Sequence, residues 1–182
     1  MEKKLDPQHL DVVAFARDAV SLKGQGQLVG WPRLAEEQFG DALVAGPVVW
    51  QLQGHGIAQP TGGDQVGLDL KASVHLPMQC QRCLTPVLAA VEAERSFRFV
   101  ADEATAAALD DEAEEDILVI SRDFDALALV EDELILSLPL VPLHEVCPEV
   151  LPMSAADPEF EVASERPNPF GVLAGLKSDT SR

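Results

Sequence analysis

Two pairs of side chains that favour metals stand far apart in this chain. Cys80 and Cys83 form a C-x-x-C, and His144 and Cys147 form an H-x-x-C that contains the third and last cysteine. Zinc takes thiolate and imidazole ligands in a tetrahedral shell, and two cysteines at this spacing can bind one ion from a tight turn. The four side chains are therefore a candidate ligand set for one structural zinc ion.

Two other interpretations of these residues stay open. Cys80 and Cys83 can be packed thiols with His144 and Cys147 incidental, or they can form a redox pair. Oxidoreductases place such a pair at the start of a helix, which lowers the pKa of one thiol. The pair here stands between two expected strands, so the redox interpretation is the weaker one.

The segments around Cys80 and Cys83 have the pattern of a long β-hairpin. Residues 65–79 carry apolar side chains at every second position, as do much of 84–100 and the start of 46–58. Strict alternation is typical of antiparallel strands with one buried and one solvated face. With a short strand at 116–120, the pattern predicts an antiparallel sheet or a partly open β-barrel, with the C-x-x-C at a hairpin tip.

Helices are expected on both sides of these strands. The first begins with Asp6 as its cap and Pro7 at its first position and ends near Lys23, after which residues 24–30 form a turn. A second covers residues 124–138, capped by Asp123 or Asp125, and leads through an extended piece to His144. The predicted fold class is α+β.

The chain divides into one α+β domain and a tail. Residues 1–147 form a single domain, residues 148–167 form a proline-rich acidic linker or arm, and residues 168–177 form a short C-terminal helix. No apolar stretch approaches the roughly 18 residues of a membrane span, and the first residues lack the core of a secretory signal. We expect a cytoplasmic protein that does not bind membranes.

The net charge of −18 favours a basic partner over nucleic acid. Residues 101–116 contain eight acidic side chains and no basic one, and they are either a solvated loop or a surface that attracts a cationic protein. These acids are Asp102, Glu103, Asp110, Asp111, Glu112, Glu114, Glu115 and Asp116. The candidate cluster for direct RNA contact is Lys71, Arg82, Arg95 and Arg98.

The chain offers no catalytic constellation. It has no G-x-S-x-G, no H-E-x-x-H and no phosphate-binding loop, and its acidic run lacks the spacing of a calcium loop. We therefore expect neither an enzyme nor a small-molecule substrate.

Three stretches resemble the family of large ribosomal RNA subunit accumulation proteins, the YceD family. They are residues 76–84 (LPMQCQRCL), 130–142 (VEDELILSLPLVP) and 166–176 (RPNPFGVLAGL), and Leu5-Asp6-Pro7 and Pro32-Arg33-Leu34 also fit. The order and spacing agree over nearly the full length. Some members carry further cysteines after the stretch equivalent to 141–147, which make a fuller zinc site, and this chain carries His144 there.

The resemblance implies a role in the synthesis, processing or stability of 23S rRNA during assembly of the large ribosomal subunit. The resemblance to the family identifies no catalytic residues in this chain. The expected partner is a basic large-subunit ribosomal protein or a 23S rRNA precursor particle. The alternatives are a protein that binds rRNA directly through the basic cluster, and a metal-dependent RNA-processing enzyme.

Overall fold

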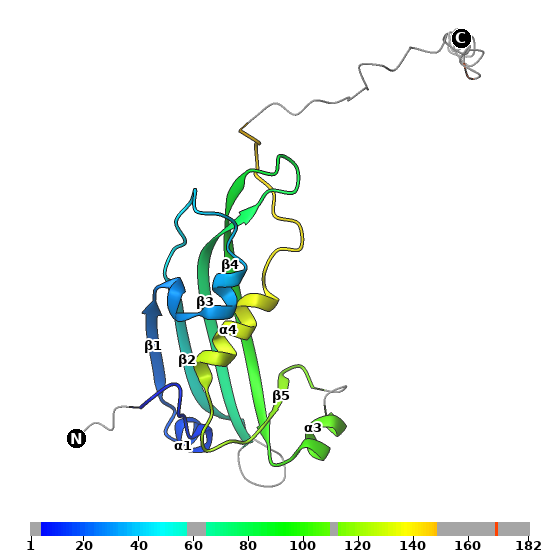
Figure 1. Ribbon diagram of the computed structural model, residues 1–182. Helices are drawn as coiled ribbons and strands as arrows, with labels where there is room; N and C mark the ends of the chain where they lie inside the picture. The colour runs from blue at the N-terminus through cyan, green and yellow to red at the C-terminus, as the bar shows by residue number, and fades with distance from the viewer. Residues whose placement is uncertain (1–4, 58–64, 110–112, 149–169, 171–182) are drawn as a thin grey trace, which may run out of the picture. The chain divides into compact units, whose positions relative to one another are not determined.

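A five-stranded sheet in the order β1-β2-β3-β4-β5 forms the centre of the computed structural model (Figure 1). The structure describes residues 5–57, 65–109, 113–148 and 170. The chain divides into a unit Met1–Pro148, which holds this sheet, and a unit Glu149–Arg182. All of the predicted linker but Pro148 and all of the predicted C-terminal helix but Phe170 lie outside the described residues.

The expected strands are present, and the sheet is open rather than closed into a barrel. β2 (Val48–Ile57), β3 (Gln65–Gln79) and β4 (Pro86–Val100) form an antiparallel meander, as the alternation predicted. β5 (Asp116–Val119) pairs with β4 in parallel, so the sheet is mixed, though mostly antiparallel as expected. The α-helix α3 (Glu103–Leu109) lies in the connection between them, where the sequence indicated only a loop.

The N-terminal region differs most from expectation. The first helix, α1, covers only Val12–Arg17, and its N-cap is Asp11 rather than Asp6. Leu10 forms an isolated bridge with Phe124, which joins the residues before α1 to the segment around Phe124. Ala19, at a φ of 47°, follows the helix and leads into β1 (Ser21–Gly26), which pairs with β2.

β1 was missed because its glycines were interpreted as turn residues. A Cβ atom on Gly24 would lie 2.4 Å from Cζ2 of Trp50, so the glycine lets the indole ring lie on the backbone of the edge strand. The residues after β1 form a 3-10 helix η1 (Leu28–Gly30) and a helix α2 (Pro32–Glu36), neither of which was expected.

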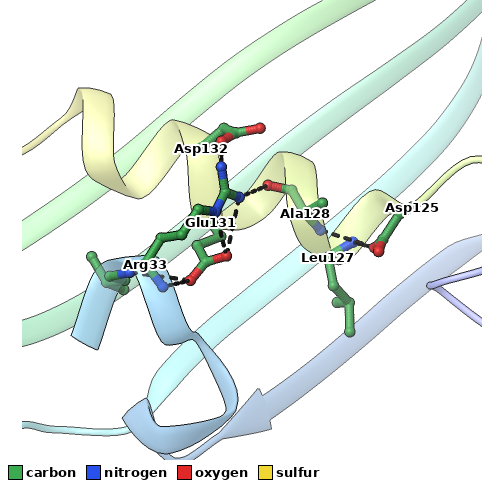
Figure 2. Close-up of polar contacts among 7 residues, drawn as sticks. Arg33, Asp125, Leu127, Ala128, Glu131 and Asp132 are labelled. Atoms are coloured by element: carbon green, nitrogen blue, oxygen red, sulfur yellow. Dashed lines mark hydrogen bonds and ion pairs between the residues drawn. The ribbon is translucent and has the colours of Figure 1, made fainter. Parts of the chain in front are cut away.

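The helices α1, α2 and α4 (Ala126–Leu136) contribute the apolar side chains that cover one face of the sheet. Alternate residues of β3 and β4 point into this core, including Leu70, Val74 and Phe97. α4 begins at its predicted cap, Asp125, whose carboxylate accepts from the N–H groups of Leu127 and Ala128 (Figure 2).

Gly54 allows α1 to lie directly on β2. A Cβ atom there would lie 2.6 Å from the carbonyl oxygen of Phe15, and backbone cannot move aside as a flexible side chain can. We expect Gly54→Ala to lower the free energy of unfolding by about 1–3 kcal/mol, as overpacking of a core does. Urea denaturation would measure it, with Gly30→Ala as the control because nothing lies within 4 Å of that position. Equal stability of the two variants would contradict the close contact.

Glu131 of α4 caps the helix α2 from across the core (Figure 2). One carboxylate oxygen accepts from the backbone N–H groups of Arg33 and Leu34 at 2.9 and 3.1 Å, and the other accepts from Nε of Arg33 at 3.0 Å. α2 has no side-chain cap of its own, and Pro32 at its first position has no N–H to satisfy. Asp132 pairs with the same guanidinium at the surface. The carboxylate of Glu131 therefore supplies the acceptor that the first turn of α2 needs.

Glu133, on the same helix, is an acidic side chain with only 8% of its area exposed, and Arg95 lies 3.3 Å away. Burial raises the pKa of Glu133 above its ordinary value, and the attraction to Arg95 offsets only part of this effect. A carboxyl whose pKa is raised by folding stabilises the fold at low pH and loses that contribution as the pH rises through the folded-state pKa.

The stability gained by Glu133→Gln relative to the wild type is therefore expected to grow as the pH rises from about 4 to about 7, because the amide does not titrate. Urea denaturation of both proteins across this range would measure the difference. A difference that does not change with pH would show that folding leaves this carboxyl unperturbed.

The β3–β4 hairpin extends beyond the end of β2. β2 pairs with β3 only as far as Ser73, whereas β3 and β4 stay paired to Gln79 and Pro86. The loop before β2 follows the free edge of this outer ribbon, where Phe39 N–H donates to Pro77 and Gly46 N–H donates to His75. The ribbon carries the residues Cys80–Thr85 at its tip.

Candidate functional site

The structure brings Cys80, Cys83, His144 and Cys147 together at the hairpin tip. Their ligand atoms all lie within 4.8 Å of one another, and none of the three cysteines forms a disulfide. The hairpin supplies two of these side chains. The segment after α4, which Figure 1 shows running up to the same tip, supplies the other two.

Backbone contacts hold the two segments against each other. The N–H group of Gln81 donates to the carbonyl of Pro142 at 2.9 Å, and the N–H group of His144 donates to the sulfur of Cys80 at 3.4 Å. Within the hairpin, Leu84 N–H donates to the Cys80 carbonyl at 2.8 Å and closes the turn. The segment that carries His144 and Cys147 therefore has a defined position on the hairpin.

Cys80 is the buried centre of the cluster. Burial disfavours its thiolate, but the backbone N–H groups of Cys83, His144 and Arg82 donate to the sulfur and lower the pKa of Cys80 to about 5. The hydroxyl of Thr85, 3.1 Å from the sulfur of Cys83, likewise lowers the pKa of that thiol. Both effects favour the thiolate, which is the form that binds a metal.

The imidazole of His144 presents a defined nitrogen to these sulfurs. Nε2 lies 3.1 Å from the carbonyl oxygen of Pro86, and Nδ1 lies 3.3 Å from the sulfur of Cys83. A carbonyl oxygen can only accept, so Nε2 carries a proton and the neutral ring turns the lone pair of Nδ1 toward the cluster. An outer hydrogen bond of this kind orients histidines that bind metals. Hydrogen bonding to the sulfur of Cys80 raises the pKa of His144, because it favours the imidazolium, in which Nδ1 carries a proton as well as Nε2.

The geometry of the cluster is close to that of a zinc shell. With zinc–sulfur bonds of about 2.3 Å and zinc–nitrogen bonds of about 2.0–2.1 Å, a tetrahedron has edges of roughly 3.5–3.8 Å. A largest separation of 4.8 Å closes to that size when the ligand atoms approach one another by about 1 Å. Three thiols and one imidazole fill all four positions, so the arrangement is compatible with a structural zinc ion.

The four basic residues predicted to contact RNA do not share one surface. Register with β3 places Arg95 on the face that α4 covers, where it pairs with Glu133, and places Lys71 and Arg98 on the opposite face. Lys71 pairs with Glu94 and Arg98 with Glu115, both at 2.5 Å. Arg82 lies at the hairpin tip, 3.8 Å from the sulfur of Cys147.

Sequence reasoning missed the functional contribution of Thr85 and of the Pro86 carbonyl, which orient two of the candidate ligands. Of the two, the contribution of Thr85 could have been predicted from the sequence, because a hydroxyl two residues after a cysteine can reach its sulfur in a tight turn. The Pro86 carbonyl is a backbone group and carries no sequence signal. None of the helices among the described residues has the length and apolar composition that crossing a membrane requires.

Comparisons with known proteins agree on one family. The model of the family "Large ribosomal RNA subunit accumulation protein YceD" matches residues 68–177, which include both halves of the cysteine–histidine cluster. A protein of Haemophilus influenzae named "Large ribosomal RNA subunit accumulation protein YceD" is 38% identical over 111 residues. That match covers 59% of this chain and 63% of the relative, so it spans less than two thirds of the relative's length. No solved structure matches the chain. Because the family model covers more than half of the residues, this chain belongs to the YceD family of large ribosomal RNA subunit accumulation proteins.

Proposed function

We propose that this protein supports the accumulation of 23S rRNA during assembly of the large ribosomal subunit, and that it does so by binding rather than by catalysis. Membership of the YceD family is the observation that carries the proposal.

The partner that the charge favours is a basic ribosomal protein or a pre-ribosomal particle that displays one. A net charge of −18 repels the phosphates of RNA and attracts cationic proteins, and this attraction accelerates their association. Three cations of the basic cluster are already paired with carboxylates, which leaves less positive charge for phosphate. We therefore rank the protein partner above direct binding of rRNA.

Titration of the purified protein against isolated large-subunit ribosomal proteins and against 23S rRNA fragments tests this proposal. We expect saturable binding of at least one basic ribosomal protein and weak binding of RNA. Nanomolar affinity for RNA with a steep salt dependence, and no protein partner, would favour the direct RNA binder instead. Cleavage of rRNA precursors that a chelator abolishes would favour the RNA-processing enzyme.

We also infer that the cysteine–histidine cluster holds one structural zinc ion. Cys80, Cys83 and Cys147 would bind it through sulfur and His144 through Nδ1, and the closed shell would leave no position for a substrate. The ion would add its four ligand bonds to the hydrogen bonds that already join the hairpin tip to the segment after α4.

A further inference from the structure

The apolar side chains that face solvent are concentrated around the hairpin tip. Twelve large apolar side chains are exposed among the described residues, and seven of them lie within residues 84–88 and 136–146. Five of the exposed side chains lie within four residues of a member of the cysteine–histidine cluster in the sequence and are named here the tip surface: Leu84, Leu140, Val141, Leu143 and Val146. Leu140 is 98% exposed and Val146 is 83% exposed. Apolar side chains gathered on one part of a surface mark sites of protein contact.

The backbone that carries the tip surface is held in place. Pro142 accepts a hydrogen bond from Gln81, and His144 contacts both Cys80 and Pro86, so residues 142–144 are fastened to the hairpin. Pro139 and Pro142 each restrict the backbone further. A segment fixed in this way loses little conformational freedom when it binds, and its exposed side chains are available as anchors.

Leu84 is held in an unusual conformation that keeps its side chain outside. Its φ is 59°, in the left-handed region that large side chains seldom adopt, and 61% of its surface is exposed. The hydrogen bond from its N–H group to Cys80 maintains this conformation. A strained backbone conformation that a structure retains points to a functional constraint at that position.

The chemistry of the tip surface identifies the class of partner. Residues 79–88 and 139–148 contain no aromatic side chain on which a base could stack, and their charged side chains are Arg82, Glu145 and, when protonated, His144. The side chains that this surface exposes are therefore mainly aliphatic, which suits an apolar patch of a protein and not a nucleic acid. The strongly acidic remainder of the chain favours a basic protein as the partner.

We propose that the tip surface is the anchor by which this protein holds a basic protein, with Leu140 and Val141 inserted into an apolar patch of that partner. This inference rests on the proposed function and adds to it the surface, the contact chemistry and the role of the cysteine–histidine cluster, which holds the anchor in its binding conformation.

The test compares matched serine variants in titrations against individually purified large-subunit ribosomal proteins. For whichever of these proteins the wild type binds, we expect the double variant Leu140→Ser/Val141→Ser to bind at least about tenfold more weakly, as loss of central apolar anchors does. The control is Val29→Ser/Val44→Ser, because each valine is 87% exposed and lies outside the tip surface. It should bind as the wild type does, and both variants should keep the melting temperature of the wild type.

The outcomes separate this inference from the proposed function. Equal affinities of the wild type and Leu140→Ser/Val141→Ser would overturn the anchor and leave the proposed function standing. A lower melting temperature with unchanged affinity would also overturn it, because the side chains would then pack within the chain. A wild type that binds none of the ribosomal proteins would refute the protein-binding mechanism and this inference together.

Discussion

Cys80→Ser is expected to abolish the bound zinc of the purified protein, from close to one equivalent to less than about a tenth of one. Structural zinc sites contribute about 10–16 kcal/mol in all, so one of four ligands accounts for about 2.5–4 kcal/mol, or about a 100- to 1000-fold loss of affinity. Among the four candidate ligands, substitution of Cys80 should cost the most zinc affinity, because its side chain is fully buried and its sulfur accepts from three backbone N–H groups. Elemental analysis of protein purified without added zinc gives the measurement.

A histidine pair provides the matched control for this experiment. His144→Ala should lose zinc as Cys80→Ser does, whereas His75→Ala, on the exposed face of β3, should retain it. A wild type that contains no metal and has normal stability would indicate that Cys80 and Cys83 are packed thiols and not zinc ligands.

Glu131→Ala is expected to lower the free energy of unfolding by about 3 kcal/mol, which for a chain of this size lowers the melting temperature by about 6–12 °C. The substitution leaves the backbone N–H groups of Arg33 and Leu34 without an acceptor, where Glu131 has only 8% of its side chain exposed. The guanidinium of Arg33 loses its closest buried partner at the same time. Thermal denaturation followed by circular dichroism would measure the loss.

Asp132→Ala separates this capping effect from the ion pair. Asp132 contacts the same guanidinium, but 47% of its side chain is exposed, so its removal should cost no more than about 1 kcal/mol. Glu131→Gln, which keeps an acceptor oxygen, should fall between the two. A similar loss in Glu131→Ala and Asp132→Ala would show that the charge pair, and not the cap on α2, is what matters.

The hairpin and α4 could be predicted because their signals are local. Alternation over residues 65–79 determines which face is buried, and Asp125 with the apolar residues that follow it defines the start of α4. From these two elements the sequence indicated that the C-x-x-C lies at a tip. The return of His144 and Cys147 to that tip was a condition of the candidate ligand set and had no sequence signal of its own. The geometry brings these side chains together, while zinc itself remains a prediction.

The missed elements depend on contacts between residues far apart in the chain. β1 has the sequence SLKGQG, which has little strand preference, and it is a strand because β2 pairs with it and Trp50 lies on Gly24. α2 is only five residues long and relies on a carboxylate 97 residues away from Leu34. No window of neighbouring residues contains either signal. The same holds for the ion pairs of Lys71, Arg95 and Arg98, which the sequence presented as available cations.

The overhang of the β3–β4 hairpin has a consequence for how an ion reaches Cys80. Two paired strands are marginally stable on their own, whereas the five-stranded centre opens only with the whole unit, so the outer ribbon should exchange its amide hydrogens through separate, lower-energy openings. Cys80 has no exposed surface in the closed form. Metal exchange therefore has a route through local fraying of the tip that leaves the core intact, and its rate would follow the dynamics of this ribbon rather than global stability.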